Sequence, residues 1–167
     1  ATYVDAQGLI QSTNEIGAEE ITNGDFSNGS ANWTLGTGWS ISGGKATHTG
    51  STGNLSQNIG VSNKTVLLTF EVLTIDDGVC NVIDDDISTI ALASFSTIGV
   101  KTVTLNFVGN SIGIRSNSTN CSIDNVSVKE VISATNTPRL DYSTGAEAFL
   151  LEPQSTNLVT YSELFSD

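Results

Sequence analysis

The sequence predicts an all-β protein, a sandwich of two antiparallel sheets, on three observations. Ser, Thr and Asn together number 57 of the 167 residues and Gly adds 16, a composition of polar strand formers and turn residues. Short segments in which apolar and polar residues alternate follow one another at the spacing of a sandwich. No segment has a sustained helical period, and Ser155 to Phe165 shows only a weak one.

The first strands are expected around a tight hairpin. Gly43-Gly44 separates two short runs, 39–42 and 45–49, and Gly-Gly between such runs is typical of a two-residue turn. A strand over 55–59 follows. The longest strand is expected over 66–73, because every second residue from Val66 to Val72 is apolar and one face is therefore strongly hydrophobic.

Five more strands are expected in the second half of the chain. The first of them ends where Asp84, Asp85 and Asp86 interrupt the apolar run. A turn at Gly109-Asn110 separates the third of these strands from the fourth. The five strands are expected over 79–83, 87–93, 102–107, 112–115 and 122–131.

The charge of the chain argues against two classes of partner. The net charge is −12, with 6 basic and 18 acidic residues. Nucleic acid is not expected to bind, because phosphate recognition depends on Lys and Arg. An anionic membrane surface is not expected either, and no apolar run is long enough to span a bilayer. No basic and apolar leader is visible, and the initial Ala indicates a fragment of a longer polypeptide.

Two segments mark the ends of the alternating region. It opens with EITNGDFS (residues 20–27), followed by Trp33 and Gly38-Trp39, and it closes with IDNVSVK (residues 123–129). Over residues 18–131 the chain thus resembles a β-jelly-roll carbohydrate-binding module of the type attached to xylanases and β-glucanases. The resemblance implies a jelly-roll sandwich of two antiparallel sheets, in which Phe26 and Trp33 are core residues.

The two flanks, residues 1–17 and 132–167, carry little alternation and resemble something else. ATYVDAQGLIQ (residues 1–11) and PRLDYSTGAEAFLLEPQSTNLVTYSELFS (residues 138–166) are similar to the two halves of one segment common in tail-fibre and other structural proteins of bacteriophages. The jelly roll would then be an insertion, which a host tolerates when the termini of the insert lie close together. The resemblance implies a place on the virion surface and contacts with other virion proteins through the flanks.

Calcium is the metal that the first resemblance implies. Such modules often hold a structural Ca²⁺ where the first and last strands meet, bound by hard oxygen ligands. Asp124 matches the usual carboxylate, and main-chain oxygens of Asp25 and Lys45 are further expected ligands. Ser27 stands where many relatives have Glu, which removes one ligand. The alternative is that Asp25 and Asp124 cap turns, and residues 84–86 are either a second cation site or a solvated loop.

Sugar binding needs aromatic rings for C–H faces and polar side chains for hydroxyl groups. Aromatic residues are only 7% of the chain, which argues against a broad flat platform for crystalline polysaccharide. Arg115 interrupts an apolar alternation and would offer several donors in one plane, although a salt bridge is the plainer interpretation. His48 is equally open to a structural interpretation. The residues expected in the cleft are Trp39, His48, Gln57, Glu71, Asp77, Asn81 and Arg115.

Other chemistry is not expected. No acid and base stand out for glycoside hydrolysis, His48 has no G-x-S-x-G nucleophile to serve, and no phosphate-binding loop is present. Cys80 and Cys121 are too few for a disulfide framework or a Cys-based zinc site. They are interpreted as ordinary small residues on or near strands, which could pair if adjacent.

The function expected from the sequence is non-catalytic binding of a soluble β-linked polysaccharide, such as β-glucan or xylan, for attachment of a phage to glycans. Weak single sites would gain strength through many copies on a virion. The alternative is a structural spacer or decoration domain of a tail fibre without a ligand, which predicts a cleft filled by apolar side chains and no exposed Trp. An enzyme such as a depolymerase is the third and least favoured reading.

Overall fold

The computed structural model describes residues 2–4, 10–12, 14–50, 52–60, 62–76, 78–87, 90–117, 119–133, 139–141 and 148–150. Contacts divide the chain into two units, one of Ala1–Glu15 with Ser133–Asp167 and one of Ile16–Ile132. All regular elements in these described ranges are β-strands. None of the described segments is therefore a helix that could cross a membrane.

The first unit contains two short antiparallel pairs. β1 (Thr2–Val4) pairs with β2 (Ile10–Ser12), and β14 (Arg139–Asp141) pairs with β15 (Ala148–Leu150). The weak helical expectation for residues 155–165 lies outside the described residues.

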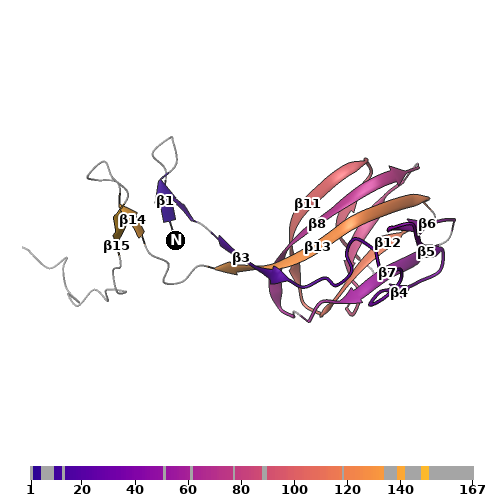
Figure 1. Ribbon diagram of the computed structural model, residues 1–167, viewed down its shortest axis with the longest axis horizontal. Coiled ribbons are helices and arrows are strands. Elements are labelled where there is room, and N and C mark those ends of the chain that lie inside the picture. Colours follow the sequence, from indigo (N-terminus) through magenta and orange to yellow (C-terminus); the bar gives the residue numbers. More distant parts are fainter. Residues whose placement is uncertain are drawn as a thin grey trace, which may run out of the picture. The chain divides into compact units, whose positions relative to one another are not determined.

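The second unit has one sheet of five strands (Figure 1). Neighbouring strands in it are antiparallel throughout. Its order is β10 (Ala91–Phe95), β9 (Cys80–Asp84), β12 (Ser111–Ser116), β7 (Gly53–Asn58) and β4 (Thr34–Leu35).

The opposing sheet has six strands. Long strand β13 (Cys121–Ser133) lies at its centre and pairs antiparallel with β8 on one side and β6 on the other. The order is β11 (Gly99–Phe107), β8 (Lys64–Ile75), β13, β6 (Lys45–His48) and β5 (Trp39–Ser42), with β3 (Asn14–Glu19) also paired to β13. The predicted all-β jelly-roll sandwich of two antiparallel sheets is confirmed.

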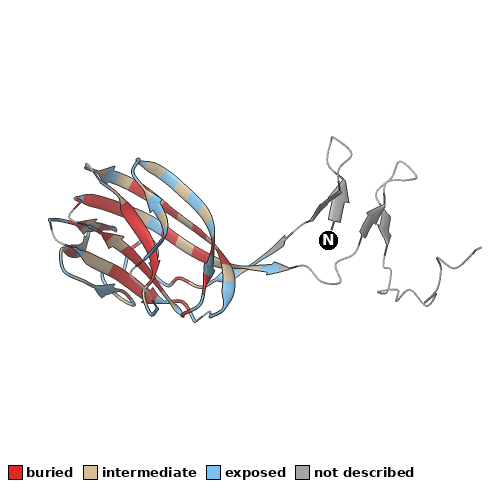
Figure 2. Cartoon of the chain, turned by 180° about the vertical axis from the view of Figure 1, so that it is seen from behind, coloured by how far each residue is buried: buried red, intermediate tan, exposed pale blue. Residues whose placement is uncertain are grey.

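The core lies between the two sheets, and β8 shows how the sequence forms it. Val66, Leu68, Phe70 and Val72 are at most 1% exposed, while the residues between them face away from the core. Figure 2 shows this alternation of buried and more exposed residues along the strands. Burial of one large apolar side chain stabilises a fold by about 1.5–3 kcal/mol, so this strand is a major contributor to stability.

The two segments that mark the ends of the alternating region meet in the fold. The amide of Val126 donates to the carbonyl of Gly24 at 2.9 Å. Asn125 has a φ of 54°, a left-handed conformation that Asn tolerates better than most residues, where the β13 register shifts. Phe26 and Trp33 are buried against each other with ring centroids 5.3 Å apart, so both are core residues as predicted.

One strand lies later than the sequence predicts. The strand expected over 87–93 is β10 at Ala91–Phe95, because residues 85–87 form a turn instead. Asp84 Oδ2 accepts the amides of Val108 (2.9 Å) and Gly109 (2.8 Å). The carboxylate at the end of β9 thus binds the turn between β11 and β12. Apolar periodicity in the sequence does not predict this contact.

Candidate functional site

Polar side chains gather on the outer face of the five-stranded sheet. In β12, Ile112 and Ile114 point into the core, so Gly113 and Arg115 face outward. In β7, Leu55 points inward, and Asn54 and Ser56 face outward. Because β7 and β12 are neighbours, these outward residues form one surface.

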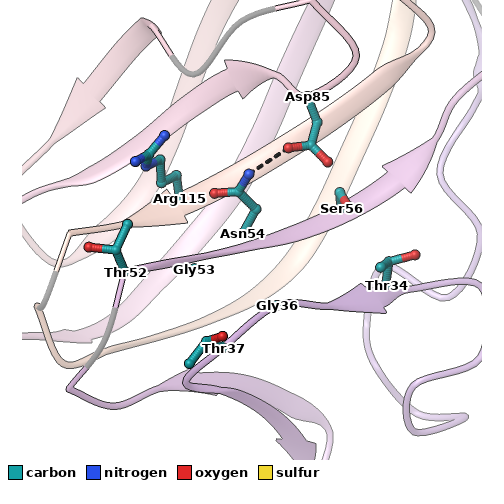
Figure 3. A pocket seen from close by; sticks show the side chains of 9 residues that line it. All are labelled: Thr34, Gly36, Thr37, Thr52, Gly53, Asn54, Ser56, Asp85 and Arg115. Atoms are coloured by element: carbon teal, nitrogen blue, oxygen red, sulfur yellow. Dashed lines mark hydrogen bonds between the residues drawn. The ribbon is translucent and has the colours of Figure 1, made fainter.

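This surface contains a groove with a volume of about 440 Å³ (Figure 3). Its floor includes two glycines at which strands approach closely. A Cβ on Gly53 would lie 2.0 Å from the carbonyl oxygen of Thr37, and one on Gly36 would lie 2.5 Å from that of Asn54. The groove is lined by Thr34, Gly36, Thr37, Thr52, Gly53, Asn54, Ser56, Asp85 and Arg115.

Two hydrogen bonds orient the largest side chains of the groove. Asn54 Nδ2 donates to Asp85 Oδ1 at 2.6 Å, which fixes the amide and leaves its oxygen as an acceptor. Arg115 Nε donates to Asn117 Oδ1 at 3.0 Å. Among the described residues the ion pair is Lys64 with Glu130, so Arg115 is not part of a salt bridge there. Its terminal guanidinium nitrogens remain as donors beside Asn54 (Figure 3).

A second predicted residue lies beside Arg115. Asn81 of β9 is the register partner of Arg115, and its Oδ1 accepts a hydrogen bond from Ser94 at 2.7 Å. Asn81 is nevertheless 7% exposed, and Ile83 packs over Gly113 on the same face. The outer face is therefore partly covered at β9 and open toward β7 and β4.

Three predicted cleft residues lie in the interior instead, and a sugar cannot reach them. Trp39 is 6% exposed, its Nε1 donates to the carbonyl of Gly53 at 3.1 Å, and its ring lies 5.1 Å from that of His48. His48 is fully buried, with Nδ1 2.8 Å from the Thr119 carbonyl. Gln57 shares the inward face of Leu55 and bonds both the amide and the carbonyl of Thr22, at 2.7 and 3.0 Å.

Glu71, another predicted cleft residue, is not brought to the groove. Glu71 lies in β8 of the six-stranded sheet, opposite Asp124 of β13, and so belongs to the other sheet. Asp77 lies outside the described residues. The predicted set therefore contributes Arg115 to the groove and Asn81 beside it.

Three residues that line the groove were not predicted for the cleft: Asn54, Ser56 and Asp85. The signal was present in β7, where Leu55 and Gln57 alternate with Asn54 and Ser56. Since Gln57 points inward with Leu55, its neighbours must face outward. No comparable signal separates Asp85 from Asp84 and Asp86, whose carboxylates bond the amides of residues 108–110 instead.

The expected calcium ligands lie around one corner of the six-stranded sheet. Ile123 pairs with Ala46, so the residues next to them, Asp124 and Lys45, are close in the register. The main-chain oxygen of Asp25 lies 3.8 Å from a Cβ built on Gly44. Oxygen donors of this kind suit Ca²⁺, although the described residues hold no group of three or more His, Cys, Asp or Glu that could bind a metal.

The side chains of Asp25, Ser27 and Asp124 are engaged in local hydrogen bonds. Asp25 Oδ1 accepts the amide of Ser27 at 3.2 Å and its hydroxyl at 2.9 Å, and these bonds lower the pKa of the Asp25 carboxyl. The Ser27 hydroxyl thus holds Asp25 rather than standing free. Asp124 Oδ1 accepts the amide of Asn125 at 2.7 Å, which leaves its second oxygen.

No family model and no curated protein matches the sequence. Solved structures that are similar include one described as "CBM4 structure and function", with 16% identity and a TM-score of 0.41, over 66% of this chain and 99% of that chain. A family 29 carbohydrate-binding module has 14% identity and a TM-score of 0.41, over 73% of this chain and 90% of that chain. A variant of such a module complexed with cellulohexaose has the same identity and TM-score, over 73% of this chain and 93% of that chain.

Proposed function

We propose that this chain binds a polysaccharide without catalysis, in the groove of the five-stranded sheet. The observation that carries the proposal is the preorganised polar lining of that groove. Asn54 is fixed by Asp85, and Arg115 presents donors that no carboxylate among the described residues neutralises. Hydroxyl-rich ligands are recognised by such convergent donors and acceptors in a concave site.

The glycan that we propose is one whose hydroxyls the polar lining can bond. A soluble β-linked chain such as β-glucan or xylan presents pairs of hydroxyls that Asn54 and Arg115 would bond. The lining residues include no aromatic side chain, so stacking adds nothing within the groove. Affinity at one site is therefore expected to be modest, and many copies would act by avidity.

A hydrolytic role at this groove is disfavoured by its carboxylates. Glycoside hydrolysis uses two of them, an acid and a base or nucleophile. Asp85 is the one carboxylate among the lining residues, and it accepts the hydrogen bond of Asn54.

The biological use that we propose is attachment to host or biofilm glycans from the surface of a phage virion. Residues 1–17 and 132–167 would join the module to other virion proteins.

Affinity electrophoresis tests this proposal. The full chain is run in native gels that contain soluble β-glucan, xylan or alginate. Retardation in one gel is expected, with loss in Arg115→Ala and in Asn54→Ala. Lys129→Ala is the charge-matched control, because Lys129 lies in β13 of the other sheet, and it is expected to run as the parent does. Equal mobility of all variants in every gel, with each shown to be folded, would contradict the proposal.

A structural spacer is the second candidate, and one observation favours it. Both Trp33 and Trp39 are only 6% exposed, as expected for a module without a stacking surface. The polar groove is the observation against it, since a spacer predicts apolar filling. Absence of retardation across a broad glycan panel would favour the spacer.

We also propose a structural Ca²⁺ at the corner of Asp25, Lys45 and Asp124. The ion would tie the opening segment to β13 and raise stability by mass action. Thermal unfolding with calcium and with chelator tests this, and Asp124→Ala is expected to abolish the difference. Glu130→Ala, which removes a carboxylate further along β13, is the control that keeps this difference. An identical melting temperature with calcium and chelator in the parent would contradict a bound ion.

A further inference from the structure

The two cysteines of the chain face each other across the sandwich. Cys80 begins β9 of the five-stranded sheet, and Cys121 begins β13 of the six-stranded sheet. The thiol of Cys80 donates to Cys121 Sγ at 2.9 Å, and both residues are at most 1% exposed. Both cysteines lie on strands, as predicted, and their two sulfur atoms are in direct contact.

The geometry is close to that of a covalent bond. A disulfide has an S–S length of about 2.05 Å, so the two sulfurs need to approach by less than about 1 Å. Both cysteines are free in this structure. Forming the bond would join the two sheets covalently.

The two thiols are not equivalent. The hydrogen bond from Cys80 lowers the pKa of Cys121, and the same bond together with burial raises the pKa of Cys80. The thiolate is the reactive form, and Cys121, which accepts the hydrogen bond of Cys80, is therefore taken as the attacking sulfur.

We propose that Cys80 and Cys121 form an oxidisable pair, which a peroxide closes into an intersheet disulfide. The Cys121 thiol releases its proton, the thiolate attacks one oxygen of hydrogen peroxide, and the O–O bond breaks to give a sulfenic acid, while the departing hydroxide takes up the released proton as water. Cys80 sulfur then attacks Cys121 sulfur, the S–O bond breaks, and the departing hydroxide takes the Cys80 proton as water. In total two thiols are oxidised and one peroxide is reduced to two waters.

The oxidant would reach the pair through the end of the sandwich nearest to it. Asp76 and Asn120 close this end, with a bond from the Asp76 amide to the Asn120 carbonyl at 2.9 Å and one from Asn120 Nδ2 to Asp76 Oδ2 at 2.8 Å. Asp76 precedes Cys80 in the chain, and Asn120 immediately precedes Cys121. Hydrogen peroxide is small, so local opening here is sufficient.

Mass spectrometry of the full chain tests the proposal. The reduced protein is treated with hydrogen peroxide. It is then denatured in the presence of N-ethylmaleimide, which labels every remaining thiol. Two labels before oxidation and none afterwards are expected, with loss of two hydrogens and a cross-linked peptide that joins residues 80 and 121. Two labels after oxidation, disulfide-linked dimers, or overoxidised separate thiols would each overturn the proposal.

Variants locate the chemistry. Cys80→Ser leaves Cys121 without a partner, so a sulfenic acid and no intramolecular bond are expected. Asn120→Ala loosens the closing contact and is expected to speed oxidation several-fold, whereas Asn117→Ala is expected to keep the parent rate. If the Ser variant does not fold, the parent chain alone decides the question. The oxidised parent is expected to melt roughly 10 °C above the reduced one, and equal melting temperatures would overturn the intersheet bond.

Discussion

Gly24 and Val126 are in direct backbone contact, although 102 positions separate them in the sequence. The Val126 amide donates to the Gly24 carbonyl at 2.9 Å, and a Cβ on Gly24 would lie 1.9 Å from the Val126 oxygen. No side chain can be accommodated at that distance. The opening segment therefore needs a glycine at this position, because the backbone of the closing segment passes too close for a side chain.

Gly24→Ala is accordingly expected to destabilise the fold severely. The added methyl group would meet backbone rather than a movable side chain, so the strands must separate, at a cost of about 3 kcal/mol or more. Denaturant unfolding followed by fluorescence measures this. Gly29→Ala is the control, since nothing lies within 4 Å of its Cβ position and only its φ of 57° opposes the change, at about 1 kcal/mol. Equal losses in the two variants would refute the steric argument.

Asp84→Ala is expected to lower the free energy of unfolding by about 2–4 kcal/mol. Its Oδ2 accepts the amides of Val108 and Gly109, and the residue is 5% exposed, so its removal leaves two donors without their acceptor. Asp86→Ala loses one bond at an exposed position and should cost less than about 1 kcal/mol. Urea unfolding of both variants distinguishes them, and a smaller loss at Asp84 than at Asp86 would contradict this assignment.

Trp39→Phe separates core packing from ligand binding. The variant loses the bond from Nε1 to the Gly53 carbonyl and some packing against His48, so a stability loss of about 1–2 kcal/mol is expected. Retardation in a glycan gel should change by less than about twofold, because the bonds that orient Asn54 and Arg115 are intact even though Gly53 loses the Trp39 donor. Complete loss of retardation from a folded Trp39→Phe would show that the ring takes part in binding.

The pKa of Asp25 gives a prediction for acid pH. The amide and hydroxyl of Ser27 lower the pKa of the Asp25 carboxyl below its ordinary value of 3.8. This carboxylate therefore adds stability above pH 3.8, and that stability is lost as the pH falls through the folded-state pKa. In Ser27→Ala the pKa should move back toward 3.8, since the hydroxyl bond is gone. Titration of the Asp25 carboxyl carbon by NMR measures this. Ser40→Ala is the control, and an unchanged Asp25 pKa in Ser27→Ala would exclude the hydroxyl as a cause.

The strands were predictable because their alternation is a direct consequence of burial on one face. Residues 66–73 illustrate this, since each even-numbered side chain is in the core. The Asp84 to Asp86 segment was not predictable, because its carboxylates act on amides more than twenty residues later. Local apolar periodicity carries no information on such distant contacts.

The groove was less predictable than the fold. Arg115 was identified because it breaks an apolar pattern, and Asn81 because it lies near a strand end and could line the mouth of the cleft. Trp39, His48 and Gln57 were expected in the cleft, yet each side chain has an interior backbone hydrogen-bond partner, while Nε2 of His48 has none among the described residues. A polar side chain in an inward register is compatible with a core when the backbone supplies such a partner, and a sequence does not show those partners.

The pairing of β3 with β13 has a mechanical consequence. The chain enters the sandwich through β3 and leaves it through β13, so Ile16 and Ile132 belong to adjacent strands. Tension applied to these two positions would open the β3–β13 hydrogen bonds one after another from the outer end, rather than shear them all together. The other strands of the sandwich, including those that form the groove, would not be loaded until the hydrogen bonds between β3 and β13 had broken.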